Sequence, residues 1–401
     1  MEIVVVGAGQ AGSSLVSKLR ALGFDGGVTL VGEEPVVPYQ RPPLSKAYLL
    51  GDMELERLYL RSEEFYREQN ITLKLGAAVT GIDREHKELH LGEERLGYDL
   101  LALTTGSTPR RLPAAIGGDL EGVFTVRTLA DIDRMQPELG AGKKALIIGG
   151  GYIGLEAAAV CAKLGLDVTL VEMADRILQR VAAPQTSDYF RALHEDHGVD
   201  IREGIGLEKL IGEGRVSGAL LTDGEELAAD VVIVGVGIAP CTQIAELGGL
   251  MLDNGIKTDA QGRTSDPSIF AAGDCASFPH GEGRIRLESV GNAIDQAEVV
   301  AANMLGAETP YVAKPWFWSD QYDTKLQIAG LNTGYDEIVT RDGEGGAVSF
   351  WYYGEGKLLA VDAMNDSRAY MVGKRLIEGG KSPDKAAVAD PGTELKALLK
   401  A

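Results

Sequence analysis

The sequence has few cysteines. Cys161, Cys241 and Cys275 are the three in 401 residues, and no two of them form a CxxC or CxxxxC pair. Disulfide frameworks and cysteine metal sites need paired cysteines, so the sequence predicts neither, and we interpret the three side chains as small buried hydrophobic groups. Basic residues are also scarce, with 39 Lys and Arg against 59 Asp and Glu and a net charge of −20. Because nucleic acids and anionic membranes bind basic surfaces, neither is expected as a partner.

Long apolar runs are missing as well. The run around Ile147 is interrupted by glycines and by Glu156, so no membrane-spanning helix is predicted. Met1–Val6 leads directly into Gly7 without a basic start, which argues against a signal peptide. We therefore expect a cytoplasmic protein, and the length of 401 residues gives it room for two or three domains.

What the chain does contain is a strand, a glycine turn, a helix and a second strand in one unbroken unit. In chain order these are the strand Ala145–Ile148, the GxGxxG glycines Gly149, Gly151 and Gly154, a helix to Lys163, the strand Val168–Val171 and the acid Glu172. Such a turn places a diphosphate on the free N–H groups at the positive end of the helix. Glu172 suits the adenosine ribose 2′-OH and would repel a 2′-phosphate, so we predict NADH rather than NADPH.

A second copy of this pattern lies at the N-terminus. It consists of the strand Val4–Val6, the glycines Gly7, Gly9 and Gly12, a helix to Leu22, the strand Val28–Val31 and the acid Glu33. Two copies in one chain imply two bound dinucleotides. The sequence therefore predicts an α/β fold with two doubly wound dinucleotide-binding domains.

The order of the motifs predicts three domains. Residues 1–108 and 240–315 should form a discontinuous first domain, to which the chain returns after the buried strand Val231–Gly237. Residues 109–239 should form the second. Residues 316–401 contain three alternating segments typical of antiparallel strands, and we expect a small C-terminal α+β domain there.

Five motifs spread over nearly the whole chain point to one family. They are RPPLSK (41–46), GGGYIGLE (149–156), AAGDCA (271–276), RLESVGNAIDQA (286–297) and PWFWSDQYD (315–323). With these motifs the chain resembles the FAD- and NADH-dependent ferredoxin reductases of the putidaredoxin reductase and rubredoxin reductase type, which serve bacterial P450 and aromatic-ring oxygenases. Apoptosis-inducing factor and monodehydroascorbate reductase share much of this plan. The resemblance implies FAD in the first domain, NAD in the second and an interface domain at the C-terminus.

The resemblance also assigns residues to the two cofactors. It implies that Asp274 binds the ribityl chain of FAD, that Glu33 binds its ribose and that the backbone of Val79 contacts adenine; for Asp274 a purely turn-forming role stays open. The residues implied at FAD are Gly7, Gly9, Ala11, Gly12, Glu33, Arg41, Lys46, Val79, Arg127, Asp274 and Val290. The residues expected at NAD are Gly149, Gly151, Gly154, Glu172 and Gly237.

Three residues are expected to act in catalysis. Lys46 lies in the proline-rich stretch Pro35–Leu50, which we expect to be an irregular functional loop. The resemblance implies that Lys46 and Glu156 form an ion pair beside the flavin N5, where Lys46 stabilises the reduced flavin, and that Trp318 lies at the flavin edge facing the protein partner. The alternatives are a solvated loop lysine, a glutamate that balances a helix dipole and a tryptophan packed in a core.

These expectations combine into one function. The chain should take a hydride from NADH onto FAD and pass electrons one at a time to a small iron–sulfur ferredoxin, or a rubredoxin, that supplies a P450 or aromatic-ring oxygenase. Two alternatives stay open: an NADH oxidase-like enzyme, and an NADH-sensing redox interaction protein resembling apoptosis-inducing factor. An oxidase of that type and a disulfide reductase both use a cysteine near the flavin, and this chain has none before Cys161.

Two further expectations concern the partner and the nicotinamide side. The cations nearest Trp318 in sequence, Arg284, Arg286, Lys314 and Lys325, are candidates for a basic docking patch, with scattered solvated charges as the alternative. The segment GVGIAP is followed by Cys241 where similar proteins usually carry asparagine, and whether this change alters the nicotinamide-side contacts of the loop stays open. No metal site of the chain's own is predicted, and the oligomeric state stays open.

Overall fold

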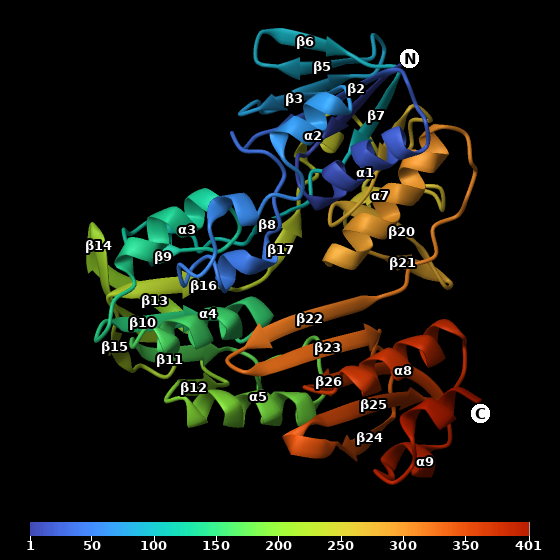
Figure 1. Cartoon of the computed structure of the whole chain (residues 1–401). Coiled ribbons are helices and arrows are strands. Elements are labelled where there is room, and N and C mark those ends of the chain that lie inside the picture. The colour runs from blue at the N-terminus through green and yellow to red at the C-terminus, as the bar shows by residue number, and fades with distance from the viewer. Residues whose placement is uncertain (401) are drawn as a thin grey trace. The chain divides into compact units, whose positions relative to one another are not determined.

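The structure is a computed structural model that describes residues 1–400, and these residues form two compact units (Figure 1). Unit 1 comprises Met1–Arg41, Glu54–Thr108 and Ile238–Pro315. Unit 2 comprises Pro42–Met53, Pro109–Gly237 and the chain from Trp316 onward. Among residues 1–400, no helix combines the length and the apolar character that a membrane crossing requires.

A five-stranded parallel sheet is the centre of unit 1. In spatial order its strands are β19 (Ile269–Ala271), β7 (Leu100–Leu103), β1 (Glu2–Val6), β2 (Gly27–Gly32) and β3 (Ile71–Leu75). The register between β1 and β2 runs from the pair Glu2 and Gly27 to the pair Val6 and Val31. Because all five strands run the same way, their carboxyl ends meet at one edge of the sheet.

Both faces of this sheet are covered. The covering layers are α1 (Gln10–Ala21) and α7 (Val290–Met304), which pack side by side on one face, and the antiparallel strands β4 (Gly81–Asp83), β5 (Glu88–Leu91) and β6 (Glu94–Gly97) on the other (Figure 1). Ile3 and Val5 pack in the core under the helices, while Val4 and Val6 pack with the antiparallel layer. Since successive side chains of a strand alternate between faces, burial on both sides explains the unbroken apolar run.

The other elements of unit 1 are short. They are the 3₁₀ turn η2 (Leu55–Arg57), α2 (Glu63–Glu68), α6 (Gln243–Leu247), the strands β18 (Ile256–Lys257), β20 (Ala276–His280) and β21 (Gly283–Ile285), and β8 (Ser107–Pro109) and β17 (Ile238–Pro240), at two points where the chain passes between the units. Ser62 caps α2, because its side chain accepts a hydrogen bond from the Phe65 N–H.

Unit 2 contains a second five-stranded parallel sheet. In spatial order its strands are β12 (Asp200–Glu203), β11 (Asp167–Glu172), β10 (Lys144–Ile148), β16 (Val231–Val234) and β9 (Val123–Phe124). An antiparallel sheet of β13 (Leu207–Glu213), β14 (Arg215–Leu221) and β15 (Glu226–Ala228) shares a hydrophobic core with it. The helices of this part are α3 (Leu129–Met135), α4 (Tyr152–Lys163) and α5 (Pro184–Asp196), with the 3₁₀ turns η1 (Pro42–Ser45), η3 (Ala114–Ile116) and η4 (Gln136–Glu138).

The remainder of unit 2 is an antiparallel sheet with two helices. In spatial order its strands are β22 (Trp316–Gln321), β23 (Thr324–Gly330), β26 (Lys357–Met364), β25 (Val348–Gly354) and β24 (Glu337–Asp342), accompanied by η5 (Glu344–Gly346), α8 (Ser367–Glu378), α9 (Lys385–Ala389) and η6 (Leu395–Lys400). Helix α8 packs on one face through Tyr370 and Leu376 against Trp351 and Val361. Strand β22 packs against α4, which joins this sheet to the nucleotide-binding part of the unit (Figure 1).

Several local expectations were wrong. Pro42–Ser45 forms a 3₁₀ helix, because proline fits the first turn of a helix, where its missing N–H is not needed. The predicted strand Val231–Gly237 ends at Val234. The stretch Pro42–Met53, which we expected in the first domain, belongs to unit 2, where η1 packs against α3 and α4.

Candidate active site

The glycine turn of unit 2 has the geometry of a diphosphate cradle. Gly149 has a φ of 104°, and a Cβ on it would lie 2.5 Å from the Gly235 carbonyl oxygen. A Cβ on Gly154 would lie 2.0 Å from the Gly149 oxygen, so packing alone requires both glycines. A Cβ on Gly151 would meet no atom of residues 1–400 within 4 Å. The second glycine thus faces open space at the N-terminus of α4, where the free N–H groups can receive an anion.

The N-terminal turn repeats this geometry. A Cβ on Gly7 would lie 2.1 Å from the Thr104 oxygen, and one on Gly12 would lie 2.0 Å from the Gly7 oxygen. A Cβ on Gly9, like one on Gly151, would meet no atom of the surrounding described chain within 4 Å. Ala11 is buried in the first turn of α1. Both turns therefore fit the diphosphate of a dinucleotide, and in both the glycine that packing does not require is the one that a ligand would approach.

The predicted FAD residues of unit 1 follow the carboxyl edge of its sheet in one order. Asp274 lies just beyond β19, Gly7 follows β1, Glu33 follows β2 and Val79 lies beyond β3. With about 4.8 Å between neighbouring strands, the four spacings from β19 to β3 span roughly 19 Å. Asp274 accepts a 2.7 Å hydrogen bond from Ser107 Oγ, Glu33 is exposed and Val79 is half-buried. This order suits a dinucleotide extended along the edge, with its diphosphate at the glycine turn.

Arg41 takes part in a local cluster rather than standing alone. Its Nη2 lies 2.6 Å from Glu34 Oε1, and Tyr39 donates a 2.5 Å hydrogen bond to Glu34 Oε2. Burial acts to lower the pKa of Arg41, but the charges of Tyr39 and Glu34 outweigh it and the pKa is raised. Glu34 is thus balanced within the loop, which leaves the neighbouring Glu33 as the acid directed to solvent at the end of β2.

Backbone N–H groups near the glycine turn of unit 2 hold the carboxylate of Glu172 in place. Its Oε2 accepts a 2.7 Å hydrogen bond from the Gly150 N–H, and its Oε1 accepts a 2.8 Å bond from the Ala174 N–H. The carboxylate therefore lies beside the glycine turn, where it can also accept a ribose hydroxyl. Gly237, with a φ of 101°, follows β16 on the other side of β10.

Lys46 and Glu156 form the ion pair that the resemblance implied. Lys46 Nζ lies 2.8 Å from Glu156 Oε1, and the two side chains are 18% and 6% exposed. Two serines also donate to the carboxylate: Ser45 Oγ to Oε2 at 2.8 Å and Ser319 Oγ to Oε1 at 2.7 Å. A buried carboxylate needs such partners, so Glu156 is fixed rather than a free charge at the start of a helix.

Trp318 lies on the strand that supplies Ser319. Its ring stacks on that of Trp316, with centroids 5.5 Å apart, and both rings are half-buried. Side chains of a strand alternate between its faces, so Ser319 and Phe317 face α4 while Trp316 and Trp318 face away from it. The contact between the rings of Phe317 and Tyr152 on α4 agrees with this division.

Two more residues implied at FAD occupy helix starts. Arg127 is half-buried directly before Thr128, which caps α3 in a capping box with Asp131. Val290 is the first residue of α7, and its neighbour Ser289 caps that helix. Both residues therefore lie at the N-terminal end of a helix, one directly before the cap of α3 and one directly after the cap of α7.

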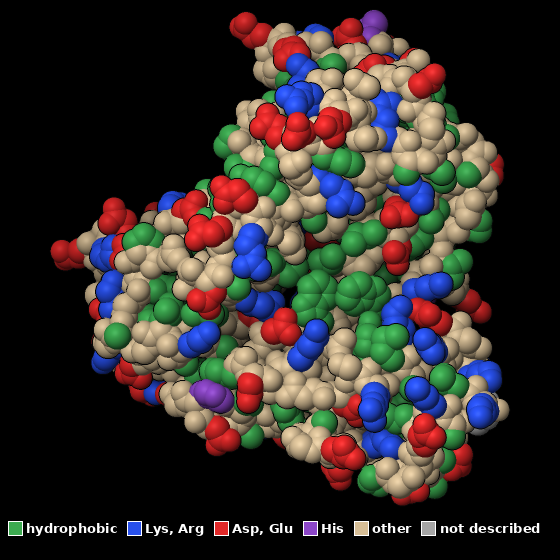
Figure 2. Space-filling model, in the orientation of Figure 1, with side chains coloured by type: hydrophobic (Ala, Val, Ile, Leu, Met, Phe, Trp, Pro, Cys, Tyr) green, Lys and Arg blue, Asp and Glu red, His purple; other side chains and the backbone are tan. Residues whose placement is uncertain are grey.

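Two of the suggested docking cations, Arg284 and Arg286, bind backbone carbonyl groups within unit 1. Arg284 donates to the carbonyl groups of Thr258 and Ser277, and Arg286 donates to those of Asn254 and Asp274. Their side chains are 22% and 10% exposed, so these two guanidinium groups mainly hold the loops of unit 1. Figure 2 shows Lys and Arg side chains gathered instead over the C-terminal part of unit 2, around α8.

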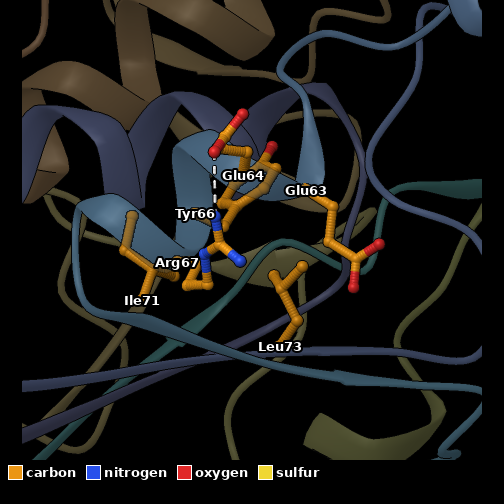
Figure 3. A pocket seen from close by; sticks show the side chains of 6 residues that line it. All are labelled: Glu63, Glu64, Tyr66, Arg67, Ile71 and Leu73. Carbon is orange, nitrogen blue, oxygen red and sulfur yellow. Dashed lines mark hydrogen bonds and ion pairs between the residues drawn. The ribbon is translucent and has the colours of Figure 1, made fainter.

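The cysteines and one surface depression were the remaining candidates for a site. Cys161 and Cys275 are buried thiols, and burial raises the pKa of Cys161 to about 12. Within residues 1–400, no group of three His, Cys, Asp or Glu side chains could hold a metal ion. Figure 3 shows a depression beside α2 and β3, lined by Glu63, Glu64, Tyr66, Arg67, Ile71 and Leu73, where Glu64 pairs with Arg67. It lies outside the predicted sites.

The sequence interpretation missed the two serines. Ser45 and Ser319 lie inside the motifs RPPLSK and PWFWSDQYD, but these motifs did not indicate that the two side chains bind Glu156. They contact Glu156 across sequence separations of 111 and 163 residues, and no local periodicity signals such contacts.

The chain is similar to known proteins over nearly its full length. Residues 1–297 match the family model described as pyridine nucleotide-disulphide oxidoreductase, and residues 316–399 match the reductase C-terminal family. The chain is 44% identical to a ferredoxin–NAD(P)(+) reductase from a Sphingomonas species, covering 99% of this chain and 97% of that protein. It is 41% identical to the putidaredoxin reductase of Pseudomonas putida, covering 100% and 97%. A chain in the crystal structure of the covalent putidaredoxin reductase–putidaredoxin complex superposes with a TM-score of 0.95 at 40% identity, covering 100% and 98%.

Proposed function

Because the chain belongs to the pyridine nucleotide-disulphide oxidoreductase family, we propose that it is an FAD-dependent NADH:ferredoxin oxidoreductase. It takes a hydride from NADH and delivers electrons one at a time to a small iron–sulfur ferredoxin, or a rubredoxin, in the cytoplasm. That carrier in turn supplies a P450 or an aromatic-ring oxygenase. The observation that carries the proposal is the presence of two complete dinucleotide turns in a chain that is similar over its full length to ferredoxin reductases.

The two cofactors are assigned to the two glycine turns. Residues 1–108 and 240–315 bind FAD, with Gly9 at the diphosphate, Glu33 at the ribose and Asp274 at the ribityl chain. Residues 109–239 bind NADH, with Gly151 at the diphosphate and Glu172 at the adenosine ribose. Residues 316–401 form the interface domain that meets the carrier. The open space beside Gly9 and Gly151 and the order of acids along the sheet edges support this assignment.

The residues of unit 2 provide the electrostatic part of the reaction. When bound, FAD supplies the chemistry that accepts a hydride and releases single electrons. Lys46 provides a fixed cation that stabilises negative charge on the reduced cofactor. Glu156 holds the Lys46 ammonium in place at 2.8 Å, while Ser45 and Ser319 hold Glu156. Trp318 offers an aromatic surface on the face of β22 opposite to this cluster.

An NADH oxidase-like activity is less well supported. It would require an accessible cysteine that cycles through an oxidised state, whereas Cys161 and Cys275 are buried thiols whose pKa values burial raises. Cys241 is partly exposed, and its backbone carbonyl accepts a 2.6 Å hydrogen bond from Thr105 Oγ1. A cysteine-to-serine variant at this position therefore serves as the control for oxidase activity.

The test is steady-state reduction of cytochrome c by NADH, with and without an added [2Fe–2S] ferredoxin. We expect the ferredoxin to raise the rate strongly and NADPH to be a poor substitute. Rapid oxygen consumption that needs no ferredoxin and is lost in Cys241→Ser would favour the oxidase. Stable NADH-reduced flavin that passes electrons to no carrier would favour the redox-sensing alternative.

A further inference from the structure

A continuous chain of buried hydrogen bonds runs from the Lys46–Glu156 pair to a histidine on α5. Ser319 Oγ donates to Glu156 Oε1 at 2.7 Å, Gln321 Nε2 donates to Ser319 Oγ at 3.1 Å, and Gln321 Oε1 lies 2.8 Å from His194 Nε2. We infer that His194 is a positioning residue, which acts through Gln321 and Ser319 to fix Glu156 and so to set how strongly Lys46 acts on the flavin. This inference rests on the proposed function, in which Lys46 acts at FAD.

Carboxylate chemistry fixes the direction of every bond in the chain. The Glu156 carboxylate, paired with Lys46, can only accept hydrogen bonds. The hydroxyl group of Ser319 therefore donates its single proton to this carboxylate. Ser319 Oγ must then accept from the Gln321 amide NH₂, which turns the amide oxygen of Gln321 towards His194. His194 therefore carries its proton on Nε2, and its Nδ1 is left as an acceptor.

A tyrosine closes the far end of the chain. Tyr322 OH lies 3.2 Å from His194 Nδ1, the nitrogen that the chain leaves without a proton. The Tyr322 ring also stacks on the exposed His197, with centroids 3.6 Å apart. Tyr322 has a φ of 54° in the turn between β22 and β23, a conformation that is uncommon for a residue with a bulky side chain. The turn thus holds its hydroxyl against His194.

Burial makes the arrangement rigid. His194, Gln321 and Ser319 are all at most 1% exposed, so a missing partner could not be replaced by bulk water. Burial also lowers the pKa of His194 to about 4, and the nearby His197 acts in the same direction, so His194 stays neutral near pH 7. The amide of Gln321 cannot relay a proton without an unfavourable tautomer. The chain therefore orients Glu156 and does not conduct protons.

The expected effect on the flavin follows from charge. The hydrogen bonds that Ser45 and Ser319 donate stabilise part of the negative charge of Glu156. Glu156 then offsets less of the positive charge of Lys46, and the electrostatic effect of Lys46 on the cofactor is stronger. Without the Ser319 bond, Glu156 would hold Lys46 more tightly and neutralise it more fully. The reduced cofactor would lose stabilisation, and its midpoint potential would become more negative.

The test compares variants along the chain in the FAD-loaded protein. Ser319→Ala, Gln321→Met and His194→Leu should each make the flavin midpoint potential more negative and slow its reduction by NADH, by about three- to tenfold for the serine variant and less for the others. The KM for NADH should not change. His194→Gln keeps an N–H donor near the Nε2 position and should restore most of the loss. Ser349→Ala removes another fully buried hydroxyl of the same sheet, bonded to Trp351 Nε1, and should leave the potential unchanged.

A second measurement does not depend on turnover. Nitrogen NMR of the five histidines, assigned with His194→Gln, should show His194 as the neutral Nε2–H form between pH 6 and 8. An Nδ1–H form, or a potential in Ser319→Ala equal to that of the wild type, would overturn the inference. If His194→Leu does not fold, the midpoint potential of Ser319→Ala, which removes only one oxygen, is compared with that of the wild type. If the protein bound no FAD, the proposed function would fail, while the NMR result would still report on the chain.

Discussion

Thr186 Oγ1 donates a 2.7 Å hydrogen bond to the carboxylate of Asp362, which joins the start of α5 to β26 of the antiparallel sheet. The hydroxyl of Tyr352 donates to the same carboxylate oxygen, and the Ala183 N–H donates to the Tyr352 oxygen at 3.2 Å. Asp362 is 1% exposed. Burial raises its pKa to about 6, although the two hydroxyl groups act to lower it. Unit 2 therefore contains an acid that titrates near neutral pH.

The first prediction concerns the pH dependence of stability. The folded pKa of Asp362 lies above its unfolded value of 3.8, so its stabilising contribution is present below pH 4 and is lost as the pH rises through 6. Relative to Asp362→Asn, the wild type should lose about 1 kcal/mol of unfolding free energy between pH 5 and 7.5. Chemical denaturation at several pH values measures this. Asp342→Asn, at an exposed position of the same sheet, should show no such trend, and a trend of opposite sign would contradict the assignment.

The second prediction concerns FAD retention. Asp274 lies beyond β19 on the carboxyl edge of the unit 1 sheet, and Ser107 donates to its Oδ2 at 2.7 Å. Asp274→Ala should purify with most of its flavin lost, because the ribityl hydroxyls lose a charged acceptor. The flavin-to-protein absorbance ratio measures the loss. The exposed Asp253, whose nearest cation is Arg284 at 3.6 Å, provides the matched control Asp253→Ala. Full occupancy in the Asp274 variant would make Asp274 a turn residue only.

The sequence was most informative where a pattern is local. Both glycine turns and the strands around them could be predicted because steric limits on the turn and burial on both faces leave few residue types possible. The helix α5 was missed: it begins at Pro184 after an alanine cap, and its sequence is largely polar. The partners of Glu156 could not be predicted, because Ser45 and Ser319 come from segments that only the folded chain brings together.

The third prediction concerns the choice of nucleotide. Two backbone N–H groups hold Glu172, so its carboxylate cannot turn away from a 2′-phosphate. The wild type should prefer NADH over NADPH by about two orders of magnitude or more. Glu172→Gln should narrow the preference, mainly through the KM values, while kcat with saturating NADH stays close to that of the wild type. Equal use of both nucleotides by the wild type would contradict the role of Glu172.

The last prediction separates the structural from the catalytic role of the Lys46–Glu156 pair. Lys46→Met leaves Glu156 buried without its counter-charge, and breaking a buried pair in this way destabilises proteins by about 3–5 kcal/mol. Adding Glu156→Gln removes the stranded charge, and its amide oxygen can still accept from Ser45 or Ser319. The double variant should therefore recover much of the lost stability. It should not recover the rate of flavin reduction by NADH, because the fixed cation is still missing. Thermal unfolding and stopped-flow absorbance measure the two quantities. If the rate returned together with the stability, Lys46 would be a structural residue, and the cation that stabilises the reduced cofactor would have to be another one.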